Sequence, residues 1–263
     1  MTNICSLSKR TTFAVSADET KPALQCVQIK LKNNAVHATA CDGMRMMLIK
    51  DSSESQVERE FLIPGRSLQI LASISKDDDV FEVSDIGNEV VFVRGDMIFT
   101  ARKLATGGYI DTAAVIGKMK PSYTAVTDSS KMKEVLELIS VGAKLGGKRH
   151  PINLVMSNGE ISLSCNNDYS ESTSAFPAYI TQETPETGFY YDVSALLKLF
   201  QVLSGKVKLE IDAKGFMLAK TKSEAYFQAP VNPPAKKSED AKQDKGQKRA
   251  KGAKDVKETK KAA

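Results

Sequence analysis

The stretch VQIKLKNNAVHATACDG, residues 27–43, indicates how this chain folds. Apolar and polar residues alternate on both sides of Asn33-Asn34, a pattern typical of two β-strands that each bury one face. Asn tolerates the positive φ that a tight hairpin turn requires, so the two strands are predicted to pair with each other. The same pattern returns 125 residues later as INLVMSNGEISLSCNND, residues 152–168, with its own Asn-Gly turn.

The repeat continues on both sides of these hairpins. Each copy is predicted to contain a short amphipathic helix, IPGRSLQILASI (63–74) or YYDVSALLKLFQVL (190–203). Two or three further strands are expected after each helix, at residues 80–101 and 207–229. The sequence therefore predicts two copies of one structural unit.

The two copies differ at their beginnings. The second copy opens with a predicted strand at 122–127 and a helix at 128–143, with Asp128 as the N-cap. Residues 3–17 are a weaker counterpart of that helix, and no strand pattern precedes them. The first copy is therefore predicted to lack one edge strand.

These patterns predict an α+β fold with two repeated domains, each with two helices packed on antiparallel sheet. Each domain would hold roughly 110 residues, an ordinary domain size. We expect the first domain at residues 1–118 and the second at 119–231, followed by a tail at 232–263.

The net charge of +5 is unevenly distributed. The tail holds 11 Lys/Arg against 5 Asp/Glu, which leaves 26 against 27 for residues 1–231. Its only branched apolar residue is Val256 and it has no aromatic residue, so it is predicted to be disordered. Its lysines could contact phosphate backbones without sequence preference, or could simply keep the protein in solution.

Composition also indicates a cytoplasmic protein. No run of about 20 apolar residues that could span a membrane occurs, and the N-terminus lacks the features of a signal peptide. The four cysteines are scattered without metal-ligand spacing, which favours reduced core thiols. No metal or cofactor is expected.

Several segments resemble the bacterial DNA polymerase III beta subunit, the sliding clamp family. CDGMR (41–45) stands where that family has T-D-G-H-R, and FLIPGRSL (61–68) stands on its I-P-x-K-x-L helix. EAYFQAPV (224–231) lies on the family's terminal Y-x-V-M-P-M. The resemblance covers residues 9–231 and implies the second and third clamp domains, without a counterpart of the first.

The resemblance implies a surface pocket that binds a short peptide from polymerases and other partners. Apolar side chains with one cation at the rim suit such a peptide, and Met side chains adapt to several ligands. The pocket would comprise Leu24, Cys41, Gly43, Met44, Arg45, Met46, Val115, Met217, Gln228, Ala229 and Pro230.

The bend also has a purely structural interpretation, in which Met44, Met46 and Met47 fill the core and Arg45 is an ordinary surface charge. Several positions depart from the family. Met44 replaces a His, Ile110 and Ala114 replace a Pro and an Arg, and residues 228–231 replace a Met-Pro-Met run. The pocket is therefore expected to be shallower or to prefer another motif.

In such rings Lys and Arg on the helices that line the hole contact phosphates without reading sequence. The corresponding residues are Lys9, Arg10, Lys21, Arg66, Lys131, Lys133, Lys144, Lys148, Arg149 and Lys198. A solvated helix face would show the same residues.

We expect a sliding clamp that encircles duplex DNA, with polymerase, other proteins carrying clamp-binding motifs and a clamp loader as partners. Clamp rings hold six domain units, so a chain with two units would close as a homotrimer. The alternative is a clamp-like module that binds replication partners without encircling DNA. An enzyme is disfavoured, because His37 and His150 have no nucleophile or orienting acid at recognisable spacing.

Overall fold

The computed structural model describes residues 3–53, 57–76, 78–105, 109–145 and 150–234. Residues Met1–Asn232 form one compact unit. The predicted tail therefore lies outside the described residues, apart from its first three positions. None of the described helices is long and apolar enough to cross a membrane.

Each copy of the repeat contains four strands in the same order. In the first copy the sheet order is β3-β2-β1-β4, and in the second it is β11-β10-β9-β13. The strands are β1 (Cys26–Lys32), β2 (Ala35–Cys41), β3 (Arg45–Ser52), β4 (Arg59–Pro64), β9 (Pro151–Ser157), β10 (Glu160–Asn166), β11 (Glu171–Pro177) and β13 (Phe189–Asp192). The predicted repeat and its α+β class are confirmed.

The hairpin turns have the predicted conformation. Asn33 and Asn34 have φ values of 52° and 55°, and Asn158 and Gly159 have 52° and 76°. Two consecutive residues with positive φ are typical of a two-residue turn whose twist matches that of the flanking strands. The turn residues therefore fix the register of β1 on β2 and of β9 on β10.

Three more strands follow in each copy. They are β5 (Glu82–Ile86), β6 (Glu89–Arg94) and β7 (Met97–Arg102) in the first copy, and β14 (Lys206–Asp212), β15 (Met217–Lys220) and β16 (Glu224–Gln228) in the second. In the second copy β8 (Pro121–Asp128) pairs with β14, and β12 (Tyr179–Gln182) pairs with β8. Among the described residues no strand pairs with the outer edge of β5, and the predicted lack of an edge strand in the first copy stays a prediction.

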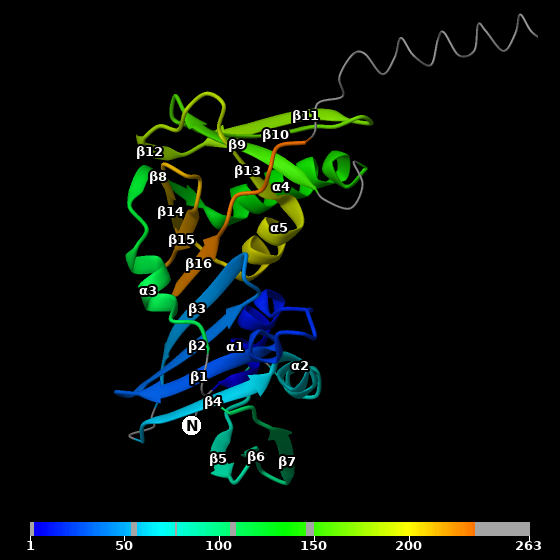
Figure 1. Ribbon diagram of the computed structural model, residues 1–263, viewed down its shortest axis with the longest axis vertical. Coiled ribbons are helices and arrows are strands. Elements are labelled where there is room, and N and C mark those ends of the chain that lie inside the picture. The colour runs from blue at the N-terminus through cyan, green and yellow to red at the C-terminus, as the bar shows by residue number, and fades with distance from the viewer. Residues whose placement is uncertain (1–2, 54–56, 77, 106–108, 146–149, 235–263) are drawn as a thin grey trace, which may run out of the picture. The chain divides into compact units, whose positions relative to one another are not determined.

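A single nine-stranded sheet joins the two copies. It runs β12-β8-β14-β15-β16-β3-β2-β1-β4, and the change from second to first copy falls between β16 and β3 (Figure 1). These two strands are antiparallel, with Tyr226 opposite Met47 and Gln228 opposite Arg45. Backbone hydrogen bonds therefore continue across the junction of the copies.

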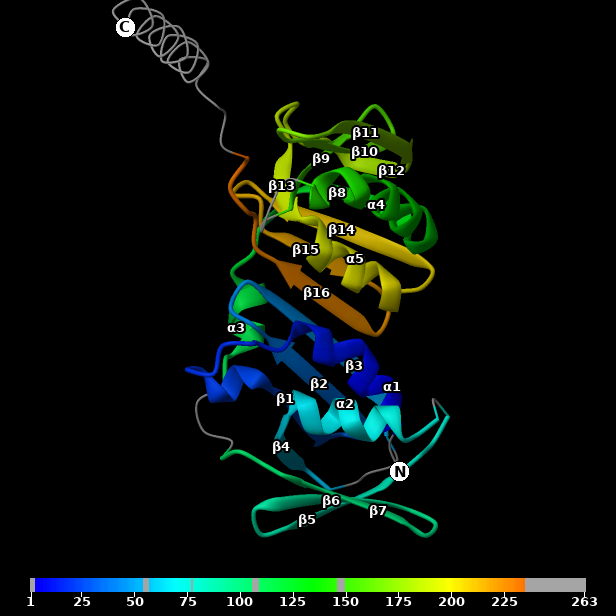
Figure 2. The ribbon, with the colours of Figure 1, turned by 90° about the vertical axis from the view of Figure 1, so that its right-hand side faces the viewer.

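The helices cover one side of the sheets. Figure 2 shows α4, α5, α1 and α2 in one layer in front of the strands, with α1 packed on α2 and α4 on α5. Their bounds, with those of the shorter helices, are α1 (Ile4–Thr11), η1 (Thr12–Ala14), η2 (Pro22–Gln25), α2 (Gly65–Ser73), α3 (Thr112–Gly117), α4 (Ser129–Lys144) and α5 (Val193–Val202).

Side-chain caps define where these helices begin. The predicted cap Asp128 accepts a hydrogen bond from the backbone N–H of Ser130 at 2.9 Å. Asp192 accepts one from Ala195 and Asn3 accepts one from Ser6, both also at 2.9 Å. The helices predicted at 63–74 and 190–203 are shorter in the structure, because their first residues finish strands β4 and β13. The domain boundary predicted at residue 118 lies between α3 and β8 and stays a prediction.

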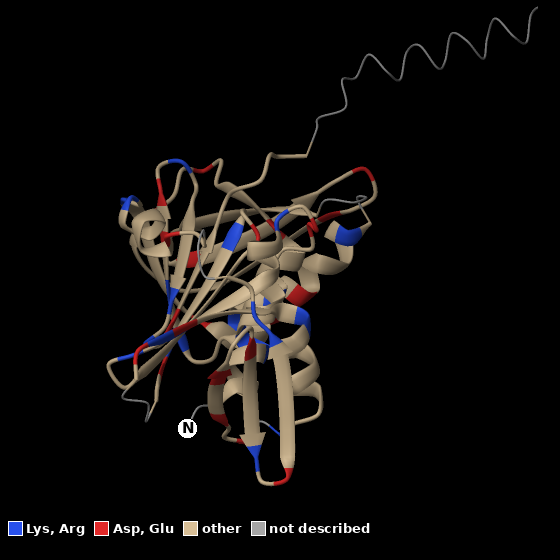
Figure 3. Cartoon of the chain, turned by 60° about the horizontal axis from the view of Figure 1, so that its bottom comes forward, with Lys and Arg blue, Asp and Glu red and all other residues tan. Residues whose placement is uncertain are grey.

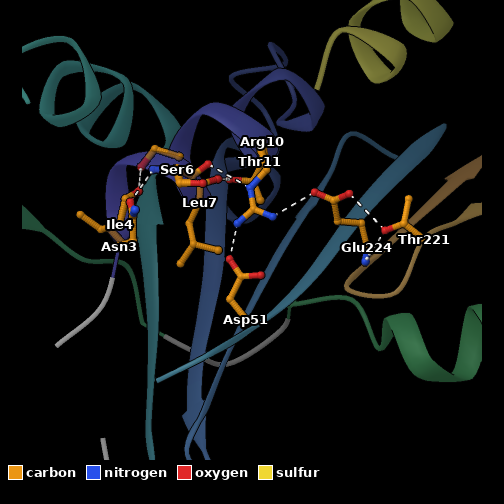
Figure 4. Close-up of polar contacts among 10 residues, drawn as sticks. Asn3, Ile4, Ser6, Leu7, Arg10, Thr11, Asp51, Thr221 and Glu224 are labelled. Atoms are coloured by element: carbon orange, nitrogen blue, oxygen red, sulfur yellow. Dashed lines mark hydrogen bonds and ion pairs between the residues drawn. The ribbon is translucent and has the colours of Figure 1, made fainter. Parts of the chain in front are cut away.

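An arginine that was predicted to face DNA makes two ion pairs at the junction of the copies. Arg10 on α1 donates a hydrogen bond from Nη1 to Glu224 at 2.9 Å and pairs through Nη2 with Asp51 (Figure 4). Glu224 also lies 3.2 Å from the Thr221 hydroxyl, which donates to it. Burial alone would lower the pKa of Arg10, but the hydrogen bonds to both carboxylates outweigh burial and raise that pKa. The guanidinium is therefore a charged bridge between β3 and β16.

Replacing Arg10 with Met should weaken the junction. The change leaves two partly buried carboxylates without their shared cation, and it should lower the free energy of unfolding by about 2 kcal/mol. Urea unfolding followed by circular dichroism measures this loss. Lys131→Met is the matched control, because the ion pair of Lys131 with Glu134 is exposed and should contribute little. If both variants unfolded at the same urea midpoint, the Arg10 bridge would contribute no more to stability than an exposed ion pair does.

Candidate functional site

The bend between β2 and β3 is held by the side chain of Asp42. One carboxylate oxygen accepts hydrogen bonds from the backbone N–H groups of Met44 and Arg45, both at 2.9 Å. The other oxygen lies 2.7 Å from Nε of Arg45. Gly43 between them has a φ of 95°, which a side chain at that position would strain. Arg45 is therefore a fixed, charge-paired group and not an ordinary surface cation.

The bend lies directly against the last residues of the second copy. Arg45 pairs with Gln228 across the β3–β16 junction, and Gln228 pairs in turn with Met217 on β15. The backbone N–H of Ala229 donates to the carbonyl of Met44 at 2.8 Å. Residues from both copies that the sequence assigned to one pocket are thus brought together.

Burial divides the predicted pocket residues into two groups. Cys41, Met46, Met217 and Gln228 are all buried, with exposed fractions of 2% or less. Met44 is 51% exposed and lies at the tip of the bend. The structural interpretation of the Met run is therefore correct for Met46 and for the buried Met47, while the Met44 side chain reaches the surface.

Tyr226 on β16 supports the strands at this junction, and it was not among the residues predicted from the sequence. Its hydroxyl donates to the side-chain oxygen of Gln228, whose amide nitrogen donates to the carbonyl of Ala229 at 3.1 Å. Phe13 stacks on the Tyr226 ring with centroids 6.1 Å apart. Burial raises the pKa of Tyr226, so its hydroxyl stays protonated and remains a donor. The only signal in the sequence was its place in the family's terminal motif.

Leu24, Val115 and Pro230 lie in the segments around this site. Leu24 belongs to η2, which contacts β1 and β2, and is half-buried. Val115 is a half-buried residue of α3, which lies beside the junction of β3 and β16 in both ribbon views (Figures 1 and 2). Pro230 is half-buried, and the next residue, Val231, donates its backbone N–H to the carbonyl of Tyr190 at 2.8 Å.

Tyr109 anchors the segment that carries α3, and it too was missed. Its hydroxyl is within hydrogen-bond distance of the backbone carbonyls of Thr39 (3.1 Å) and Cys26 (3.4 Å), on strands β2 and β1. Burial raises the pKa of this hydroxyl, with smaller contributions from Cys41 and Cys26. Asp111 then caps α3 by accepting from the N–H of Ala114 at 3.0 Å. The hydrogen bond to Thr39 could not be predicted from the sequence, because it joins residues 70 positions apart.

The four helices of the common layer carry most of the residues predicted to face DNA. Together α1, α2, α4 and α5 hold seven Lys/Arg against two Glu. Elsewhere basic and acidic positions are interspersed, as the colours of Figure 3 show. Because residues 1–231 as a whole are almost neutral, the helix layer is more cationic than the rest of the folded chain.

Individual members of this set differ in their surroundings. Lys9, Arg66, Lys144 and Lys198 are exposed on the helices. Three others are exposed or partly exposed but lie near acidic groups, with Lys131 3.3 Å from Glu134, Lys133 3.9 Å from Glu137, and Lys21 3.6 Å from Asp18. Arg10 is occupied at the junction, and Lys148 and Arg149 lie outside the described residues.

Residues 2–111 match the family described as DNA polymerase III beta subunit, central domain. The beta sliding clamp of Staphylococcus epidermidis is 29% identical over 170 residues, which span 64% of this chain and 42% of that protein. The beta sliding clamp of Bacillus subtilis is 32% identical over 114 residues, which span 42% of this chain and 30% of that protein. The matched region thus spans less than half of either curated relative.

The similarity in structure extends further along the chain. The crystal structure of the DNA polymerase sliding clamp from Bacillus subtilis aligns with a TM-score of 0.80 at 23% identity. That alignment covers 88% of this chain and 62% of the other, so it includes both copies of the repeat. The chain is therefore similar in sequence to the bacterial DNA polymerase III beta subunit, the sliding clamp, with the match to its central domain in residues 2–111, and it shares the fold of that protein over both copies of the repeat.

Proposed function

We propose that this protein is a sliding clamp, a non-catalytic processivity factor that encircles duplex DNA and tethers a polymerase to it. One observation carries the proposal: a continuous sheet joins two clamp units and places their four main helices in a single cationic layer. A surface of this kind can follow a sugar–phosphate backbone without contacting base edges. The relatives named beta sliding clamp support the same role.

The distribution of charge on the helices is compatible with a protein that slides along DNA. Many phosphate contacts would hold the protein in place and make binding steeply dependent on salt. Here Lys131 and Lys133 are paired with glutamates on their own helix, which moderates the charge that α4 presents. The proposed DNA-facing residues are Lys9, Lys21, Arg66, Lys131, Lys133, Lys144 and Lys198, together with Lys148 and Arg149.

The bend between β2 and β3 is the proposed partner site. Met44 would supply the adaptable apolar contact at the surface, while Asp42 holds Arg45 in one orientation at the rim. The buried residues Cys41, Met46, Met217 and Gln228 would support the floor of the site. Its ligands would be short peptides from a polymerase, from a clamp loader and from other proteins with clamp-binding motifs, in the cytoplasm.

A ring made from this two-unit chain requires three copies if it holds six units in total. Closure by rotation needs each copy to bind the next through a head-to-tail contact. A second candidate function is a module that binds the same partners without encircling DNA. Among the described residues the outer edge of β5 has no strand neighbour, which favours this second candidate, because an unpaired strand edge is available to a different protein.

The mass in solution separates these two candidates. Multi-angle light scattering on the purified chain should give about three times 28.6 kDa, because only the closed trimer satisfies every head-to-tail contact. A mass near 28.6 kDa at high micromolar concentration would exclude the ring and favour the module that does not encircle DNA.

Partner binding is expected to depend on Met44. Replacing it with Ser removes the exposed apolar contact of the bend but no core packing, so circular dichroism should be unchanged. Calorimetry with a polymerase-derived clamp-binding peptide should show at least a tenfold loss of affinity, or about 1.4 kcal/mol. Tyr179→Ser is the control, since Tyr179 is exposed on the distant strand β12. Equal affinities for both variants would place the partner site elsewhere.

The tail is expected to add DNA affinity that does not depend on sequence. Its 11 Lys/Arg should release counterions when they contact phosphates, which steepens the plot of log affinity against log salt. Deletion of residues 232–263 should flatten that slope in fluorescence anisotropy with duplex DNA. An unchanged slope would leave the tail with a role in solubility.

A further inference from the structure

The nine-stranded sheet has a second face, on the side away from the helix layer, which we call the outer face. Side chains alternate between the two faces of a strand. Asp51 on β3 pairs with Arg10 of α1 and therefore points toward the helices, so the neighbouring Lys50 points toward the outer face. Figure 1 shows α3 on this outer side and the four main helices on the other.

Lysines gather at one end of the outer face. Core residues alternate with lysines along β14 and β15, so these lysines also point away from the helices. Lys222 is exposed in the loop between β15 and β16, and the backbone N–H of Lys50 donates to the carbonyl of Ser223 in the same loop at 2.8 Å. These residues form what we call the lysine cluster, which comprises Lys50, Lys206, Lys208, Lys220 and Lys222.

Two members of the lysine cluster lie directly opposite each other. Lys208 on β14 pairs with Lys220 on β15. Like charges in directly opposite positions destabilise a sheet. Glu210 offsets part of this repulsion, because its carboxylate lies 2.6 Å from the ammonium group of each lysine.

Glu210 holds the two lysines in place. Burial raises the pKa of Glu210, but the hydrogen bonds from Lys208 and Lys220 outweigh burial and lower that pKa, so the carboxylate is ionised. Glu210 itself is only 6% exposed, whereas the side chains of Lys208 and Lys220 are 51% and 40% exposed. The two ammonium groups are therefore fixed at the surface before any ligand binds, which limits the entropy lost on binding.

The cluster as a whole carries excess positive charge. Lys206 lies opposite Asp128 at the end of β8. Lys50 and Lys222 are exposed, and among the described residues neither has an acidic group within ion-pair distance. Five lysines are thus accompanied by two carboxylates, those of Glu210 and Asp128. A surface of this kind fits an anionic ligand.

The lysine cluster and the bend lie at opposite ends of the same strand. Arg45 begins β3 and Lys50 lies near its end, so five residues, or roughly 17 Å, separate them. The outer face between them holds the half-buried apolar residues Leu48, Ala225 and Phe227, with Ala225 opposite Leu48 across the junction. A peptide that leaves the bend along this face crosses apolar surface and then meets the lysines.

We propose that the lysine cluster binds an acidic segment of the partner protein whose clamp-binding peptide occupies the bend. The inference deepens the proposed partner site and rests on it, because the acidic segment flanks the peptide bound there. Opposite charges would speed the encounter and add affinity at low salt.

Two other anionic or flexible ligands fit less well. Duplex DNA is proposed to contact the helix layer, which lies on the opposite side of the sheet, and a sugar–phosphate backbone gains nothing from the apolar residues beside the cluster. The chain's own tail is cationic, with 11 Lys/Arg against 5 Asp/Glu, so the lysines repel it. A protein segment with acidic residues satisfies both the charge and the apolar surface.

Paired peptides test the proposal on the full chain. A polymerase-derived clamp-binding peptide is extended, at one end or the other, by a six-residue Gly-Ser spacer and four Glu, or by the same spacer and four Gln. Six extended residues reach about 20 Å, which is enough to span from the bend to the cluster. In calorimetry at about 50 mM salt, one of the two Glu peptides should bind about tenfold more tightly than its Gln counterpart, and about 1 M salt should remove this advantage.

Cluster variants locate the effect. Lys50→Gln with Lys222→Gln should remove most of the advantage with unchanged circular dichroism, because both side chains are exposed and Glu210 keeps its two partners. Lys30→Gln with Lys32→Gln is the matched control. It removes the same charge from the outer face, but these lysines already lie 3.6 and 3.5 Å from Glu60 and Glu58, so the advantage should remain.

Two results would overturn the inference. One is equal affinity of the Glu and Gln peptides for the parent chain, and the other is an advantage that persists in the Lys50 and Lys222 double variant. A linear duplex supplies the alternative ligand. If the double variant bound duplex DNA more weakly than the parent while the Glu peptides showed no advantage, the cluster would be assigned to DNA.

Failure of the partner site itself gives a different result. The Gln peptides report on the bend alone, so the absence of their binding to the parent chain would reject the proposed partner site and this inference with it. Binding of the Gln peptides without any gain from Glu would reject only the lysine cluster as a docking surface.

Discussion

The pairing of β3 with β16 is the contact on which the rest of the structure depends. It converts two copies of a small α+β unit into one sheet, with backbone hydrogen bonds across the join. Arg10 reinforces it by holding Asp51 and Glu224 together on the helix side, and Phe13 stacks on Tyr226 beside them. The proposed partner site at the bend and the helix layer are both positioned by this join, because each combines residues from the two copies.

The same join explains why the proposed partner site is well supported although so little of it is exposed. Asp42, Tyr226 and Gln228 fix the backbone and side chains around the bend through hydrogen bonds. Met44 alone among the methionines of this stretch reaches solvent. A rigid floor with one adaptable residue limits the entropy lost when a peptide binds.

Much of the fold could be predicted from the sequence because it depends on local patterns. The Asn-rich turns, the alternation around them and the Asp128 cap are signals within a few residues, and the structure has all of them. Arg10 was assigned to DNA because a basic residue on a short helix looks the same whether it faces water or a carboxylate 214 residues away. Likewise, a run of methionines does not reveal which of them lies under a neighbouring strand.

The central claim is that the chain surrounds DNA, and the topology of the DNA tests it most directly. Protein loaded on a nicked circular plasmid should remain bound through gel filtration at high salt, and it should be lost when one restriction cut makes the plasmid linear. Phosphate contacts alone would not survive that salt, whereas a closed ring leaves only over an end. Equal loss from circular and linear DNA would contradict the account.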